Sequence, residues 1–118
     1  ARLYLAGVEM FGGEERARAL SPVLHVRPGA PPTLVMHGSA DDVVLPEDAV
    51  EFTEAMQAAG NRCDLKLYDG QGHGFFNWFD GTNPMFTETV RDMDIFLASL
   101  GYITGEPTID DFGYEGAA

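Results

Sequence analysis

The chain has 118 residues, of which 45% are hydrophobic, a composition that suits one soluble globular domain at most. Its formal net charge of −12 argues against nucleic acid or an anionic membrane as a partner, because neutralising phosphates takes clustered Lys and Arg. No apolar run approaches the roughly 20 residues that span a bilayer, and the single cysteine, Cys63, excludes an internal disulfide without revealing the compartment.

The first predicted element is a short helix over residues 14–20, with acidic side chains in its first turn. Ser21-Pro22 should end it, since a residue before proline is pushed out of the helical region. A proline-rich loop leads to residues 33–36, a continuous apolar run typical of a strand buried on both faces. This strand should stop at His37-Gly38, where glycine permits a sharp turn.

A helix is predicted over residues 46–59, with Pro46 in its first turn and Gly60 just beyond its end. Residues 63–68 alternate between apolar and polar side chains, which indicates a strand at or near a sheet edge. A buried strand, a helix and a second strand make a parallel βαβ unit with a right-handed crossover. A final helix should begin at Asn83-Pro84 and end at Gly101.

This order of elements places the chain in the α/β class, as the C-terminal βαβα part of a parallel sheet. Two strands cannot form an independent sheet of this kind, because parallel sheets are covered on both faces. The chain is therefore expected to be incomplete as a domain. Residues 1–118 are assigned to one such domain, with a core over 14–101 and a loose tail over 102–118.

Two chemically capable side chains follow the ends of the predicted strands. Asp41 comes just after the first strand and His73 just after the second, and parallel strands place ligand-binding residues at their carboxyl ends. An imidazole so placed can take a proton from a nucleophile and return it to a leaving group. A carboxylate beside it would fix its tautomer and stabilise its charged form.

The motifs around these residues resemble a known family. The chain reads His-Gly-x-x-Asp at 37–41 and Gly-x-Gly-His-Gly-Phe at 70–75. This pair is similar to the C-terminal signature of α/β-hydrolases of the esterase/lipase, dienelactone-hydrolase-like and prolyl-oligopeptidase-like groups, over roughly residues 15–100. The resemblance implies that Asp41 is the triad acid and His73 the triad histidine, with no cofactor. One departure is that the family's Val-Pro becomes Val-Leu-Pro at 44–46.

The nucleophile of such a triad is not in this sequence. There is no Gly-x-Ser-x-Gly elbow and no His-Gly-Gly oxyanion loop, and none of the three serines, Ser21, Ser39 and Ser99, sits on an elbow. We therefore expect an N-terminal part of the same domain to supply the serine, and the isolated chain to be inactive. The expected substrate is a small-molecule carboxylic ester. A prolyl-oligopeptidase-like peptidase and a non-catalytic remnant of the fold are the alternatives.

Other assignments remain open for the neighbouring polar residues. Asp42 is a rival for the acid, although a solvated turn charge is its simpler role. His37 is expected to be structural, with its ring bonded to nearby backbone, and His25 to be a surface or packing residue. A metal site could gather His25, His37, His73 and Asp41, but no pair has tight ligand spacing, so no metal is predicted.

The aromatic residues after His73 have two possible roles. Phe75 and Phe76, with Trp78, could form the wall of a substrate pocket beside the histidine. Packing against the final helix is the simpler account.

Overall fold

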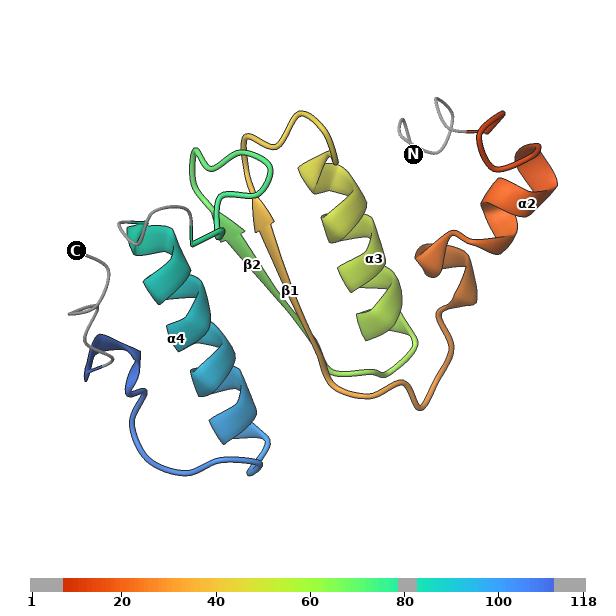
Figure 1. Cartoon of the computed structure of the whole chain (residues 1–118). Coiled ribbons are helices and arrows are strands. Elements are labelled where there is room, and N and C mark those ends of the chain that lie inside the picture. Colours follow the sequence, from red (N-terminus) through yellow and green to blue (C-terminus); the bar gives the residue numbers. More distant parts are fainter. Residues whose placement is uncertain (1–7, 79–82, 112–118) are drawn as a thin grey trace. The chain divides into compact units, whose positions relative to one another are not determined.

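A computed structural model describes residues 8–78 and 83–111. It divides into two compact units, residues 1–73 and 74–118. In the first unit lie α2 (Glu14–Ala19), the 3-10 helix η1 (Pro22–His25), β1 (Thr33–Gly38), α3 (Pro46–Ala58) and β2 (Cys63–Tyr68). In the second lie α4 (Pro84–Ser99) and the 3-10 helix η2 (Ile109–Asp111) (Figure 1).

The first unit is built on the βαβ motif of β1, α3 and β2. The strands are parallel and in register from Thr33 opposite Cys63 to Gly38 opposite Tyr68, and α3 contacts both of them (Figure 1). β1 runs two residues further than predicted, because the strand ladder continues through His37 and Gly38 instead of turning there. The α/β class and the parallel βαβ order are confirmed.

The limits of α3 follow from its terminal residues. Pro46 occupies the first turn, where its missing N–H costs nothing. At the other end Gly60 adopts a φ of 83°, and its N–H and that of Asn61 donate to carbonyls of the last turn at 2.9 and 3.0 Å. The side chain of Asn61 also accepts a hydrogen bond from Ala30 N and donates one to Arg27 O. These two bonds fasten the loop before β1 to the end of the helix.

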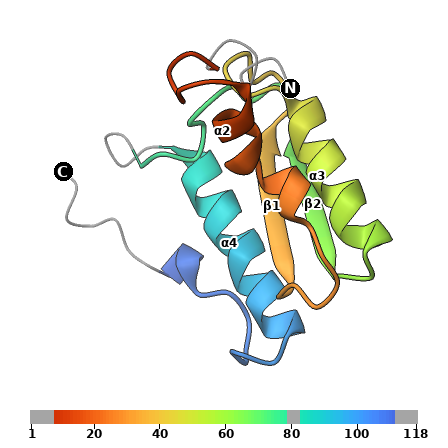
Figure 2. The ribbon, with the colours of Figure 1, turned by 90° about the vertical axis from the view of Figure 1, so that its right-hand side faces the viewer.

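The chain before β1 contains one predicted and one unpredicted helix. α2 matches the short helix predicted from Glu14, ending one residue early at Ala19. η1 follows it, with Pro22 in its first turn and Leu24 N donating to Ser21 O at 3.1 Å. η1 contacts α3, and the views from two sides place α2 and η1 on the α3 side of β1 (Figures 1 and 2).

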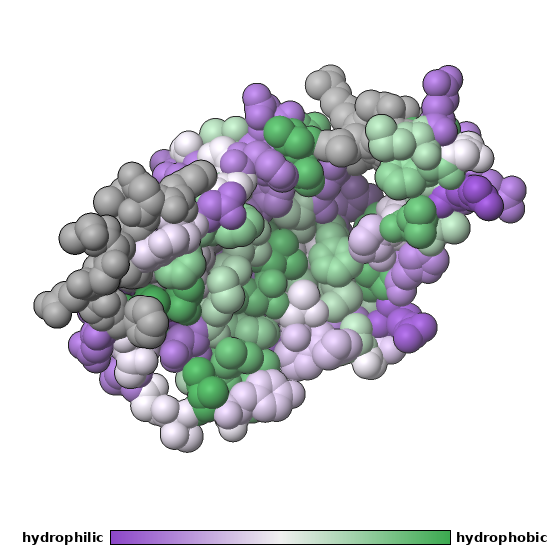
Figure 3. Space-filling model, in the orientation of Figure 1, coloured by the Kyte–Doolittle hydropathy of each residue, from purple (hydrophilic) through white to green (hydrophobic). Residues whose placement is uncertain are grey.

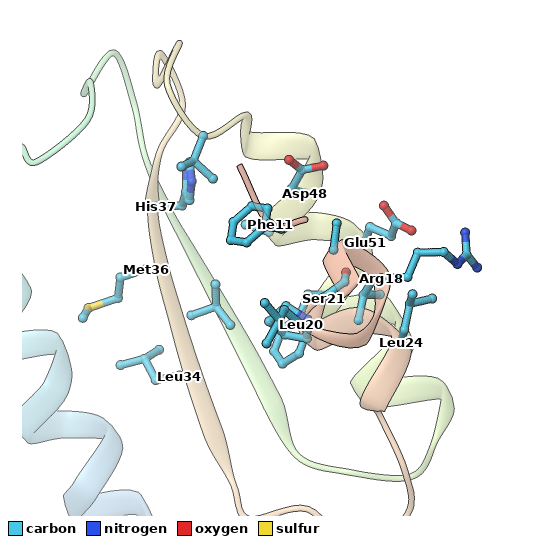
Figure 4. Close-up of a pocket in the computed structure, with 17 residues that line it drawn as sticks. Phe11, Arg18, Leu20, Ser21, Leu24, Leu34, Met36, His37, Asp48 and Glu51 are labelled. Atoms are coloured by element: carbon cyan, nitrogen blue, oxygen red, sulfur yellow. The ribbon is translucent and has the colours of Figure 1, made fainter. Parts of the chain in front are cut away.

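A hollow of ≈ 850 Å³ lies between these helices, β1 and the start of α3 (Figure 4). Its walls are mainly apolar, and apolar side chains are exposed where β1 runs in the space-filling view (Figure 3). β1 was predicted to be buried on both faces, but residues 33–37 are only half-buried. Within residues 8–78 and 83–111, β1 has β2 as its one strand partner, so its other edge is unpaired.

In the second unit, α4 begins and ends as predicted. The Asn83 side chain accepts from Met85 N at 3.1 Å, and its amide donates to the carbonyls of Phe75 and Asn77. Gly101, with a φ of 78°, follows the last turn. η2 lies in the segment that was predicted to be a loose tail, and an ion pair between Asp110 and Arg91 joins it to α4. No helix in the described parts of the chain is long and apolar enough to cross a membrane.

Candidate active site

Asp41 lies three residues beyond the end of β1, with its carboxylate almost fully enclosed. Residue exposure is 7%, and Oδ1 accepts hydrogen bonds from the backbone N–H groups of Val43 and Val44, both at 2.9 Å. Burial raises the pKa of this carboxyl, but the hydrogen bonds from Val44, His73 and Val43 outweigh it and hold the pKa below its usual value. Asp41 is therefore ionised at neutral pH.

His73 reaches Asp41 from the loop that follows β2. Its Nδ1 lies 2.9 Å from Oδ2 of the carboxylate. A carboxylate oxygen only accepts, so Nδ1 is the donor and carries the proton. In the neutral ring this leaves a lone pair on Nε2. The His73 side chain is 55% exposed, so a reacting group can approach the imidazole ring.

His37 is the second imidazole near this carboxylate. Its Nδ1 donates to the carbonyl of Gly38 at 3.0 Å, the backbone bond that the sequence predicted. Its Nε2 lies 3.7 Å from Asp41 Oδ2, too far for a hydrogen bond but close enough for attraction if the ring is protonated. His37 also lines the hollow beside β1 (Figure 4).

The other candidate residues lie apart from this pair. Asp42 is exposed, and the carboxylate bonded to His73 is that of Asp41. His25 donates from Nε2 to Ala19 O at 2.6 Å, which is a local contact between η1 and the end of α2. Within the described residues, no three His, Cys, Asp or Glu side chains are grouped as metal ligands would be.

The predicted pocket aromatics belong to the second unit. The rings of Phe75 and Phe76 meet edge to face, with centroids 5.4 Å apart. Trp78 packs in the same manner against Phe86 of α4, at 4.9 Å. The Trp78 contact matches the packing interpretation. The pocket role of Phe75 and Phe76 stays a prediction.

Two residues at the site were not predicted to contribute to it. A Cβ at Gly38 would lie 2.2 Å from the carbonyl oxygen of Gln71. The close approach of the loop after β2 to the end of β1 therefore requires glycine at this position. The Ser39 hydroxyl accepts from Gly70 N at 2.8 Å. Parallel strand ends meet at one sheet edge, so the same reasoning that joined Asp41 to His73 could have joined Ser39 to Gly70.

The family of the chain follows from a match over most of its length. The model of the prolyl oligopeptidase family matches residues 7–100, a span that includes β1, α3, β2 and both members of the Asp41–His73 pair. The chain belongs to the prolyl oligopeptidase family. The predicted membership of the α/β-hydrolase superfamily is thereby confirmed.

Solved and curated relatives of this prolyl oligopeptidase family chain include several esterases. A propionate-bound structure of esterase 2 from Thermogutta terrifontis is 41% identical, with a TM-score of 0.73 over 81% of this chain and 35% of that one. The probable isoprenylcysteine alpha-carbonyl methylesterase ICMEL2 of Arabidopsis thaliana is 39% identical over 56% of this chain and 18% of its own length. Esterase LipC of Mycobacterium tuberculosis is 41% identical over 49% and 15%. The chain thus spans about a third or less of these proteins.

Proposed function

We propose that this chain supplies the acid, Asp41, and the base, His73, of a serine hydrolase that acts on carboxylic esters. The observation that carries the proposal is the hydrogen bond from His73 Nδ1 to Asp41 Oδ2 at 2.9 Å. It joins a fixed, ionised carboxylate to an imidazole whose other nitrogen is exposed and able to accept a proton. That is the arrangement that general-base activation of a hydroxyl requires.

The reaction proceeds by two acyl transfers. His73 Nε2 takes the proton of a serine hydroxyl as its oxygen attacks the ester carbonyl carbon. The tetrahedral intermediate collapses, the C–O bond to the alcohol breaks, and His73 returns the proton to the departing alcohol oxygen. Water then attacks the acyl-enzyme with the same help from His73, releasing the carboxylic acid and restoring the serine. Asp41 keeps the proton on Nδ1 and stabilises the imidazolium formed in each half-reaction.

The serine of this mechanism is proposed to lie N-terminal to residue 1 of the same protein. None of the three serines of the chain lies in a Gly-x-Ser-x-Gly elbow. The unpaired edge of β1 and the apolar hollow of ≈ 850 Å³ beside it suit a further parallel strand and its helix. We infer that such a segment is needed both to cover this surface and to complete the active site.

The names of the relatives favour an ester as the substrate. Solved structures of T. terrifontis esterase 2 are described with bound propionate and bound butyrate, and the curated relatives include methylesterases and an esterase. By analogy, the substrate proposed here is an ester with a short acyl group. A peptide bond is the second candidate, supported by the description of the family as prolyl oligopeptidases.

The test uses the chain joined to the segment that precedes it in its natural protein. Hydrolysis of a short-chain nitrophenyl ester is measured beside cleavage of a proline-containing peptide. Ester turnover that disappears in His73→Ala supports the proposal, and peptide cleavage alone would transfer the same chemistry to the second candidate. Ester turnover that survives His73→Ala would refute the assignment of the base. An upstream sequence without a serine elbow would indicate a non-catalytic member of the fold.

A further inference from the structure

Two loops carry the candidate catalytic pair, and they touch at more than the pair itself. We name residues 39–42, after β1, the acid loop, and residues 69–73, after β2, the histidine loop. Beyond the strands, Ser39 N donates to Tyr68 O at 3.0 Å and Ala40 N donates to Gln71 O at 2.9 Å. The backbones therefore remain paired almost as far as Asp41.

The Ser39 side chain adds a contact between these backbone bonds. Its Oγ accepts from Gly70 N at 2.8 Å and, at the longer distance of 3.5 Å, donates to the Asp69 carboxylate. Gly70 has a φ of 71°, so it is the residue at which the histidine loop reverses direction after β2. The hydroxyl therefore holds the turn from which His73 extends.

Steric contact limits the same loop from the other side. Gly38 has no side chain, and the carbonyl oxygen of Gln71 occupies the space that a Cβ there would need. The histidine loop thus lies against the bare backbone of Gly38 while Ser39 bonds its turn. His73 comes two residues after Gln71 and Asp41 two residues after Ser39, so these contacts lie close in sequence to both members of the pair.

We propose that Ser39 is a positioning residue, which acts through Gly70 to hold His73 Nδ1 within hydrogen-bonding distance of Asp41. Ser39 is exposed, so water can replace its hydroxyl at Gly70 N without leaving a buried polar group unpaired. Its effect should therefore fall on the order of the histidine loop more than on folding. The consequence for turnover rests on the proposed function, but the consequence for the His73–Asp41 hydrogen bond does not.

The test follows the proton on His73 Nδ1 by NMR, in the chain joined to the segment that precedes it in its natural protein and labelled with nitrogen-15 in histidine. A proton shared with a carboxylate resonates at low field, and its assignment comes from its loss in His73→Ala. In Ser39→Ala we expect this proton to exchange with water about 2- to 10-fold faster, the effect of losing one exposed hydrogen bond. Ser39→Thr keeps the hydroxyl and should restore the exchange rate of the unmodified chain.

Two further variants make the result decisive. Ser99→Ala removes an exposed hydroxyl at the end of α4, where it bonds Phe96 O, and should leave the His73 proton unchanged. Gly38→Ala should displace the histidine loop and abolish the resonance. Equal exchange rates in Ser39→Ala and Ser99→Ala would overturn the proposal, as would a Ser39→Thr variant that behaves like Ser39→Ala. Neither readout depends on catalysis, so a failure of the proposed function would leave this inference standing.

Discussion

His73 Nδ1 lies 2.9 Å from Asp41 Oδ2, although 32 residues separate the two in sequence. The contact arises because β1 and β2 are parallel and end at the same edge of the sheet, so the loops that follow them are neighbours. The two oxygens of the carboxylate have different partners: Oδ1 is held by backbone N–H groups and Oδ2 accepts from the imidazole. Because the two carboxylate oxygens have different partners, variants of Asp41 and of His73 test different interactions.

The proposed function predicts that removing the base, His73, nearly abolishes turnover in the protein that joins this chain to its upstream segment. For His73→Ala we expect kcat to fall by about 10⁴-fold or more, because the serine proton then has no acceptor. KM should change little, since the imidazole acts mainly in the transition state. Steady-state ester hydrolysis checks this. His25→Ala is the matched control, and comparable losses in both variants would point to misfolding.

The identity of the acid can be tested with two adjacent carboxylates. Asp41→Asn should reduce kcat by about 10³- to 10⁴-fold, because an amide can donate to Nδ1 and so favour the wrong histidine tautomer. Asp42→Asn changes an exposed neighbour and should keep activity within about 2-fold. The two kcat values, measured side by side, decide between these acids. A larger loss in Asp42→Asn would exchange their roles.

The lowered pKa of Asp41 predicts a stability change at acid pH. An unperturbed aspartate has a pKa of 3.8, and that of Asp41 in the folded chain lies lower. The stabilisation from its ionised form is therefore fully present above pH 3.8 and is lost as the pH falls through the lower folded-state pKa. Urea unfolding midpoints measured across this range should show the loss.

Asp110 has a lowered pKa too, because of its hydrogen bond to Arg91, so it contributes to the same pH range. The contribution of Asp41 is the difference in pH dependence between the unmodified chain and Asp41→Asn. If Asp41→Asn kept it as well, the hydrogen bonds of this carboxylate would not favour its ionised form in solution.

The isolated 118-residue chain should not react with a fluorophosphonate probe. None of its three serines follows the elbow pattern, and the Ser39 hydroxyl already bonds Gly70. A solved structure of T. terrifontis esterase 2 is described as phosphorylated by paraoxon, so that esterase is a suitable positive control. Mass spectrometry of the intact chain after incubation checks the prediction. A phosphonylated serine in the chain itself would contradict it.

The sequence predicted the elements whose limits are determined by single residues. Pro46 and Gly60 mark the ends of α3, and Asn83 and Gly101 those of α4, because proline, glycine and asparagine act through their own backbone or side-chain geometry. The approach of the two strand ends was predictable for a similar reason. A parallel βαβ unit allows little else.

The features that depend on contacts between elements were harder to predict. Gly38 was expected to form a sharp turn after the strand, whereas it is the last residue of β1, and its missing side chain leaves room for the carbonyl of Gln71. η1 is a single short turn held against α3, and such a contact leaves no periodic pattern in the sequence. The half-buried state of β1 depends on which neighbours cover it, and its apolar run alone predicts the opposite.

The backbone hydrogen bonds to Asp41 Oδ1 also bear on which substitutions this candidate site can accept. Their donors are the peptide N–H groups of positions 43 and 44, which every residue except proline possesses. The two hydrogen bonds to the carboxylate therefore do not depend on the identity of the side chains at these positions. Proline is thus the one residue that this pair of hydrogen bonds excludes at positions 43 and 44.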